Sequence, residues 1–128
     1  FLGRFLKERR PLPAIALTTN ASAVTAIAND YEYSEIFSRQ LQGLAKTGDV
    51  LVGISTSGNS ANVIEAIKMA SECGVKSIAL TGQNPSEAGN LADIAIRAPS
   101  THTPRIQEMH IAIGHTLCEI AENSLFET

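Results

Sequence analysis

Hydroxyl side chains are concentrated in one short stretch, GISTSGNS at residues 53–60, which holds four of them together with two glycines. An apolar run typical of a buried strand precedes it, and an amphipathic helical pattern follows it. Backbone N–H groups at the start of a helix attract an anion, and hydroxyl groups add neutral donors. The stretch lacks the lysine and the spacing of a nucleotide-binding P-loop. It therefore predicts a site for a phosphate monoester rather than for a triphosphate.

A simpler interpretation of the same residues stays open. Ser60 or Asn59 could only cap the following helix, and Ser57 with Gly58 could only turn the chain. The concentration of hydroxyls at one strand end favours anion binding over these two roles alone. Residues 55–60 are called the serine loop below.

A second candidate set lies on the last predicted helix. Gln107 and His115 are eight residues apart, which places their side chains ~80° apart around a helix axis. His102 and His110 are interpreted as surface or internally satisfied side chains, and Glu108 as a solvated helix residue.

Alternating strands and helices must position these side chains. Apolar runs predict the strands, and apolar residues at helical spacing predict the helices. This order, with right-handed crossovers, implies an α/β fold with a parallel sheet covered by helices on both faces. Ligands bind at the carboxyl ends of such strands, where the serine loop falls. Strands are expected at 13–19, 47–55, 75–82 and 93–99, helices at 21–29, 33–44, 60–73 and 104–125, and a loop or short helical turn at 84–92.

The composition is that of one globular domain. The 128 residues are 44% hydrophobic and 18% charged, and the net charge of −3 offers no bulk attraction for nucleic acid or an anionic membrane. No apolar run approaches the ~20 residues that span a bilayer. Cys73 and Cys118 fall in helical patterns, which indicates reduced, buried thiols in a cytoplasmic protein. The last helix is apolar on two faces, so we expect one face to contact another subunit.

Several segments together resemble the SIS (sugar isomerase) family, and within it the phosphoheptose isomerases. The resemblance covers essentially the whole chain. It implies a flavodoxin-like three-layer α/β/α fold, a homotetramer and an active-site zinc. It also implies interconversion of sedoheptulose 7-phosphate and D-glycero-D-manno-heptose 7-phosphate, which supplies heptose for bacterial cell-surface polysaccharide. The segments are AIALTTN, AIAND, FSRQLQGLAKTGDVLVGISTSGNS, SIALTG and RIQEMHIAIGH.

The resemblance assigns roles to individual residues. Asn29 and Asp30 match a substrate-contacting pair. Gln107 and His115 match two zinc ligands, with Gln107 also touching the substrate and His115 implicated in proton transfer. The residues that it implies hold the sugar phosphate are Ser55, Thr56, Ser57 and Ser60.

The family pattern also contains parts that the printed sequence lacks. A Gly-rich loop, followed on a helix by a His and a Glu, would precede residue 1, and it supplies the other two zinc ligands and the general base. We therefore expect residues 1–128 to be a single SIS domain without its upstream helix, first strand and Gly-rich loop. Asn20 stands where the family has Asp, and no catalytic role is attached to it.

The spacing of the two zinc-ligand positions raises a geometric question. Eight helical residues rise ~12 Å, whereas zinc lies ~2.0–2.2 Å from each nitrogen or oxygen ligand. The helix could start irregularly near Gln107, the side chains could reach toward each other, or the ligands could come from different subunits.

A related SIS tetramer without enzymatic activity, which binds the replication-initiator protein, is the alternative. The tail CEIAENSLF resembles that relative. In that relative an arginine replaces the residue at the Ser57 position, and the last histidine is lost. Because this chain keeps Ser57 and His115, the isomerase interpretation is favoured. A sugar-phosphate-sensing module without turnover is a third possibility.

Overall fold

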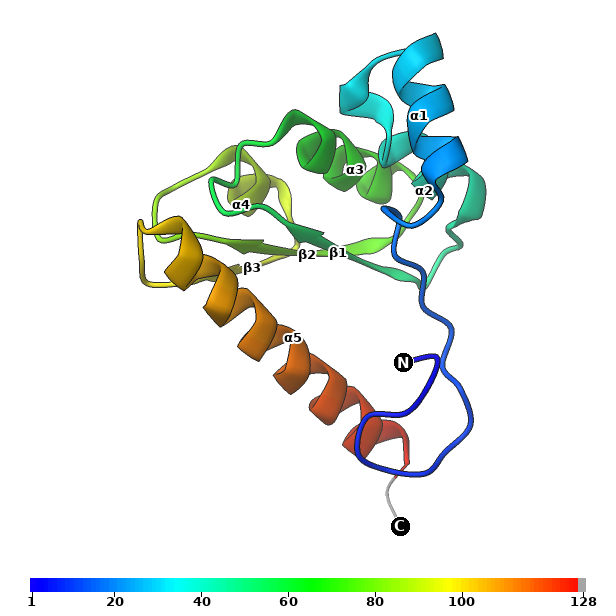
Figure 1. Ribbon diagram of the computed structural model, residues 1–128, viewed down its shortest axis with the longest axis vertical. Coiled ribbons are helices and arrows are strands. Elements are labelled where there is room, and N and C mark those ends of the chain that lie inside the picture. Colours follow the sequence, from blue (N-terminus) through cyan, green and yellow to red (C-terminus); the bar gives the residue numbers. More distant parts are fainter. Residues whose placement is uncertain (127–128) are drawn as a thin grey trace.

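The computed structural model describes residues 1–126 and shows a parallel three-stranded sheet (Figure 1). The strand order β1-β2-β3 follows the order along the chain. Val52 lies opposite Ile78, and Ile78 lies opposite Ile94 in the next strand, so apolar side chains line up across the sheet. The expected α/β architecture with helices on both sides of a parallel sheet is confirmed. The strands are β1 (Val50–Ile54), β2 (Lys76–Thr81) and β3 (Ile94–Arg97).

The main core lies between the sheet and two helices, α3 (Ala61–Glu72) and α4 (Glu87–Leu91). Both were expected, α4 as a short turn. Gly74, with a φ of 69°, ends the segment after α3 in the left-handed conformation that glycine adopts most readily. The exposed fraction of Ile67 is only 1%. The core cluster consists of Val63, Ile64, Ile67, Ala79 and Ala88.

The helix expected over 33–44 is broken in two. A short 3₁₀ helix, η1 (Tyr33–Glu35), precedes α2 (Ser38–Leu44), and both pack against α3. The interruption falls at Ile36, which is 2% exposed and whose carbonyl accepts a hydrogen bond from the Gln40 side chain at 2.7 Å. Ile36 and Leu41 are buried, as the helical spacing predicted, although the backbone from Tyr33 to Leu44 is not one continuous helix. The predicted helix before it is present as α1 (Ala21–Asp30).

The strand predicted at 13–19 is wrong. These residues form an irregular segment with a turn, and Ile15 is 68% exposed. A strand needs a neighbour that accepts its ladder hydrogen bonds, but the carbonyl of Leu17 accepts instead from the Gln40 side chain at 2.9 Å. The segment therefore does not join β1, although β1 lies at the edge of the sheet.

The long helix α5 (Thr103–Leu125) lies on the side of the sheet opposite α3 and α4 (Figure 1). It contacts β2, and its first turns bury Ile106 and His110. Farther along, α5 leaves the sheet, and residues 1–10 lie beside its C-terminal end. Apolar side chains on the free part, such as Ile111 at 64% and Ile120 at 60%, are exposed. None of the described helices combines the length and apolar character that a membrane crossing needs.

Candidate functional site at the strand ends

The serine loop leaves the carboxyl end of β1 in a fixed conformation. The Ser55 N–H donates to the Leu80 carbonyl at 3.0 Å, which continues the β1–β2 ladder by one residue. Gly58 has a φ of 67°, and its N–H donates to Ser55 Oγ at 3.1 Å. A Cβ at Gly58 would collide with the side chain of Ser86. Glycine is therefore required here both for the backbone angle and for the close approach to the next loop.

Three hydroxyl groups converge where the loop meets α3. Ser55 Oγ lies 2.9 Å from Ser60 Oγ and 3.4 Å from Ser57 Oγ. Ser55 is 6% exposed, while Ser57 and Ser60 face solvent. The first N–H groups of a helix have no acceptor within it, so donors of two kinds gather at the start of α3. This arrangement can hold an anion through hydroxyl and backbone groups.

The capping interpretation is wrong for the Ser60 side chain, because it makes no capping hydrogen bond to α3. Asn59 does have a structural role, since its Oδ1 accepts from the backbone N–H of Glu87 at 3.0 Å and thereby joins the serine loop to α4. The turn at Ser57 and Gly58 is also present. Turning the chain and gathering hydroxyls are thus compatible functions of one loop.

A small cavity opens beside the serine loop at the same edge of the sheet. Its volume is about 240 Å³, and Thr56 and Ser57 form one wall. The loop after β2 and the segment between β3 and α5 form the others, with Ile106 at the base. Three strand ends therefore meet around one hollow, as expected for a parallel sheet.

The two predicted zinc-ligand positions, Gln107 and His115, are exposed on α5. Gln107 follows Ile106, which lines the cavity, but Gln107 is not itself one of the lining residues. The ring of His115 lies 6.0 Å, centroid to centroid, from the ring of Phe5. Because α5 is helical from Thr103 onward, an irregular helix start at Gln107 is ruled out. Two explanations remain for the spacing: the two side chains reach toward each other, or the ligands of one zinc come from different subunits.

Within residues 1–126, no group of three or more His, Cys, Asp or Glu side chains could hold a metal ion. Gln107 and His115 alone supply two donors, whereas a zinc site needs three or four protein ligands. The described residues thus do not form a complete zinc centre by themselves.

The predicted pair Asn29 and Asp30 is not brought to the serine loop within this chain. Both residues lie at the end of α1, and the Asn29 side-chain amide donates to Asp30 Oδ1 at 3.0 Å. Figure 1 shows α1 beyond α2 and α3, away from the carboxyl ends of the strands. Both side chains are exposed and accessible from outside the chain.

His110 is an interior side chain, in line with the internally satisfied alternative of the two predicted for it. It is 5% exposed, and its Nε2 lies 3.1 Å from the Thr81 carbonyl oxygen. A carbonyl only accepts, so Nε2 carries the proton. The same carbonyl accepts from the Ala98 N–H at 2.9 Å. The His110 side chain thereby connects α5 to the end of β2 by a hydrogen bond. Its Nδ1 has no partner among the described residues.

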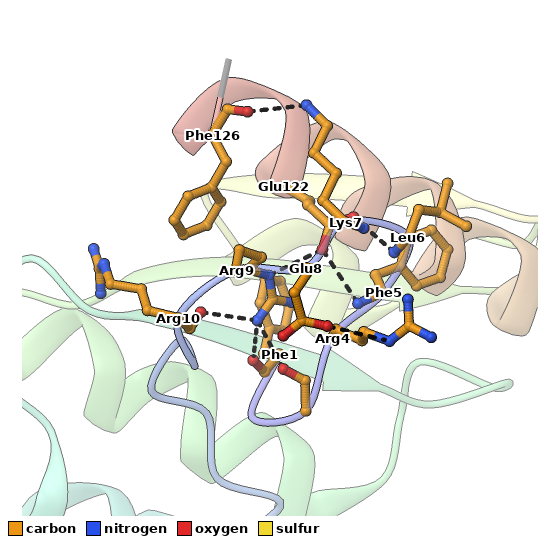
Figure 2. Close-up of polar contacts among 11 residues, drawn as sticks. Phe1, Arg4, Phe5, Leu6, Lys7, Glu8, Arg9, Arg10, Glu122 and Phe126 are labelled. Atoms are coloured by element: carbon orange, nitrogen blue, oxygen red, sulfur yellow. Dashed lines mark hydrogen bonds and ion pairs between the residues drawn. The ribbon is translucent and has the colours of Figure 1, made fainter. Parts of the chain in front are cut away.

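The sequence analysis missed Glu122, which holds the first ten residues against α5 (Figure 2). Its carboxylate is almost fully buried and accepts hydrogen bonds from the backbone N–H groups of three consecutive residues and from Arg9 Nε at 2.9 Å. Burial alone would raise the pKa of this carboxyl, but these donors together lower it to about 2. The backbone donors are Phe5 at 3.2 Å, Leu6 at 2.7 Å and Lys7 at 2.9 Å.

Residues 1–82 match the family model described as SIS domain. The chain is 56% identical over 123 residues to a phosphoheptose isomerase of Rhodospirillum rubrum, covering 96% of this chain and 65% of the relative. It is 54% identical over 127 residues to the phosphoheptose isomerase of Thermodesulfovibrio yellowstonii, covering 99% of this chain and 63% of the relative. The chain thus spans about two thirds of the length of these relatives.

The fold is similar to that of a solved phosphoheptose isomerase from Francisella tularensis. The TM-score is 0.86 at 40% identity, over 93% of this chain and 66% of the solved one. The corresponding protein from Neisseria gonorrhoeae gives a TM-score of 0.80 at 50% identity, over 83% of this chain and 60% of the solved one.

Proposed function

This chain belongs to the SIS domain family, and from that premise we propose that it acts as a phosphoheptose isomerase. The reaction would interconvert sedoheptulose 7-phosphate and D-glycero-D-manno-heptose 7-phosphate. The observation that carries the proposal is the convergence of Ser55, Ser57 and Ser60 hydroxyls at the start of α3. Relatives that are more than half identical and bear the name phosphoheptose isomerase support the choice of substrate.

In this proposal the serine loop holds the phosphate group. The oxygens of a phosphate monoester accept hydrogen bonds from the hydroxyls of Ser55, Ser57 and Ser60 and from free N–H groups at the start of α3. Thr56 contributes beside them, from the wall of the cavity. The phosphate lies far from the reacting carbons of the sugar, so this grip serves orientation rather than bond breaking.

The chemical step moves a proton between two neighbouring carbons through an enediol, and it needs an acid–base group within reach of the substrate. We assign to His115 the transfer of a proton at a substrate oxygen or at the second carbon. The imidazole is exposed, so a ligand can approach it from solvent. Gln107, exposed on the same helix, would hydrogen-bond the substrate.

Zinc is part of the proposal, with Gln107 and His115 as two of its ligands. When bound, the ion would stabilise the negative charge that develops on the enediolate oxygens. Further ligands would have to come from outside the described residues, so we assign no step of the reaction to the metal.

The assembled protein is proposed to be a cytoplasmic homotetramer that supplies heptose for surface polysaccharide. Asn29 and Asp30 would contact the substrate in that assembly, since they are exposed and lie away from the serine loop of their own chain. Binding of a replication-initiator protein is the less favoured function, because this chain keeps Ser57 and His115.

The direct test is isomerisation of sedoheptulose 7-phosphate by the full-length protein with zinc. We expect turnover to require the phosphate group, with sedoheptulose itself a poor substrate. Equal rates with both sugars would contradict phosphate recognition by the serine loop. No turnover, combined with binding of an initiator protein, would refute the isomerase proposal.

A further inference from the structure

Glu122 is a buried charge to which the proposed reaction assigns no task. Its side chain is only 2% exposed, and that of Arg9, whose Nε donates to Glu122 Oε1 at 2.9 Å, is 3% exposed. Burial of two charges is costly unless they are paired and hydrogen-bonded. A carboxylate held in this way on a helix differs from a solvated surface group, and its other contacts show which part of the chain it fixes.

The Glu122 carboxylate fixes the backbone of three consecutive residues (Figure 2). Its Oε1 accepts from the Phe5 N–H at 3.2 Å, and its Oε2 accepts from the Leu6 and Lys7 N–H groups at 2.7 and 2.9 Å. Hydrogen bonds to an ionised acceptor are stronger than those between neutral groups. Because the Leu6 side chain itself is 66% exposed, polar contacts rather than apolar burial hold the backbone here.

The Phe5 side chain connects this fixed backbone to His115. The two ring centroids are 6.0 Å apart, and the ring planes are tilted by 50°. This distance lies within the ~4.5–7 Å range of attractive aromatic pairs. His115 and Glu122 are separated by seven positions on α5, about two helical turns, so they lie within ~20° of each other around its axis. Residues 1–10 therefore contact both side chains along one face of the helix.

The position of the His115 imidazole matters for any proton transfer. An exposed side chain exchanges rapidly among its rotamers, and His115 is exposed on α5. A general acid or base must lie at hydrogen-bond distance from the atom that gains or loses the proton. A fixed aromatic ring beside the imidazole restricts its orientations before a substrate binds, which reduces the entropic cost of the reactive geometry.

We propose that Glu122 is a positioning residue for His115 and acts through the Phe5 ring. The carboxylate holds the backbone of residues 5–7, the backbone places the Phe5 ring, and the ring orients the imidazole. The consequence for catalysis rests on the proposed function, which assigns proton transfer to His115. The orientation of the imidazole does not depend on that function and can be measured separately.

The test uses the full-length protein and two variants that interrupt these contacts at different points. Glu122→Gln removes the charge that holds the backbone, whereas Phe5→Leu removes the aromatic ring and keeps the carboxylate. Nuclear magnetic resonance of the histidine ring protons reports how the imidazole lies against Phe5, because an aromatic ring shifts nearby proton resonances. The His115 signal is identified by its absence from His115→Asn. Kinetics with sedoheptulose 7-phosphate and zinc give kcat and KM.

Two further variants serve as controls, and thermal unfolding verifies that every variant folds. Glu119→Gln removes a charge from an exposed position of α5 that is closer to His115 in sequence than Glu122 is. It should keep the parental His115 resonances and kcat, since its carboxylate does not hold residues 5–7. Phe5→Tyr keeps an aromatic ring and should therefore restore what Phe5→Leu loses.

We expect Glu122→Gln and Phe5→Leu to shift the His115 ring resonances and to lower kcat by about 10- to 100-fold, the usual cost of losing a residue that supports a functional group. KM should stay within about twofold, because the serine loop is unchanged. Unshifted resonances in folded Glu122→Gln, or equal shifts in Glu119→Gln, would overturn the inference, and so would shifted resonances with parental kcat. An inert parent whose His115 resonances shift in both variants would refute the proposed function and support the positioning.

Discussion

Individual residues of the serine loop have separable tasks. Gly58 sets the backbone, Asn59 joins the loop to α4, and Ser55, Ser57 and Ser60 present hydroxyls toward one point. The residue types and their place after a strand were enough to predict this cluster. The task of Asn59 was not predictable, because its partner, the Glu87 backbone, is distant in sequence.

The combined change Ser55→Ala and Ser57→Ala should weaken phosphate binding by at least about tenfold, since hydrogen bonds to a charged group are worth roughly 1.5–3 kcal/mol each. Calorimetric titration with inorganic phosphate would measure the loss. Ser22→Ala, an exposed serine on α1, is the control and should bind as the parent does. Parental affinity in the double variant would contradict the site.

His115→Asn should lower turnover by about 10²- to 10⁴-fold, the usual contribution of a positioned acid–base group. The measurement is the isomerisation rate of the full-length protein, with thermal unfolding as evidence of folding. His102→Asn changes an exposed histidine in the same way just before α5 and should keep parental turnover. A folded His115→Asn protein with parental turnover would remove this residue from the mechanism.

The contacts of Glu122 predict that residues 1–10 are held against α5 less firmly at low pH. Its folded pKa of about 2 lies below the ordinary value of 4.5, so its stabilising contribution is present above pH 4.5 and is lost as the pH falls toward 2. The charged side chain that faces the carboxylate is Arg9, whose Nε donates to it, and the Lys7 ammonium donates to the Phe126 carbonyl. Hydrogen exchange of the Leu6 and Lys7 amides should therefore accelerate as the pH falls through this window, beyond the intrinsic trend.

Glu122→Gln is the matched variant, because it keeps the shape and removes the charge. In this variant, hydrogen exchange of the Leu6 and Lys7 amides should already be fast at neutral pH. It should show no acceleration at low pH beyond the intrinsic trend. An acid step of parental size in Glu122→Gln would show that another group controls the docking.

At the scale of elements, apolar runs predicted three strands correctly and one wrongly. The strands at 50–54, 76–81 and 94–97 and the helices α3 and α4 fall within the predicted ranges. Helices α1 and α5 each extend one residue beyond their ranges, and the helix predicted at 33–44 is broken in two. The segment 13–19 has the residues of a strand, yet strand formation depends on a hydrogen-bonding neighbour that composition cannot specify. Burial of His110 against β2 likewise depends on tertiary packing and leaves no mark in the helical pattern.

The core between α3 and the sheet should respond to volume in a graded way. Ile67 is 1% exposed, so Ile67→Ala should reduce the free energy of unfolding by about 2–5 kcal/mol, and Ile67→Val by about 0.5–1.5 kcal/mol. Urea unfolding of both variants would measure these differences. Equal small effects would show that this packing is not a main source of stability.

At the scale of the whole molecule, a single copy of the chain exposes apolar surface to solvent. Val50, Val52 and Ile54 of β1 are between 42% and 57% exposed, and α5 exposes Ile111 and Ile120. Surfaces of this kind are usual where further protein packs. They support the proposed homotetramer, in which the free part of α5 and the helix region from Tyr33 to Leu44 meet other copies.

Light scattering of the full-length protein should therefore give a tetrameric mass. Ile120→Asp, which places a charge on the exposed apolar side of α5, should shift the protein toward smaller species, because a buried unpaired charge is costly. Asn123→Asp adds the same charge at an exposed polar position nearby and should leave the mass unchanged. A monomeric, folded parent would contradict the assembly.

The central claim is that the serine loop binds a sugar phosphate for isomerisation. The most direct measurement is the rate of conversion of sedoheptulose 7-phosphate to the heptose 7-phosphate by the full-length protein with zinc, compared with the Ser55→Ala, Ser57→Ala double variant. We predict steady turnover by the parent and a loss of at least about tenfold in kcat/KM for the folded variant, in line with the phosphate hydrogen bonds removed. An inert parent, or a folded variant with parental kcat/KM, would contradict the account.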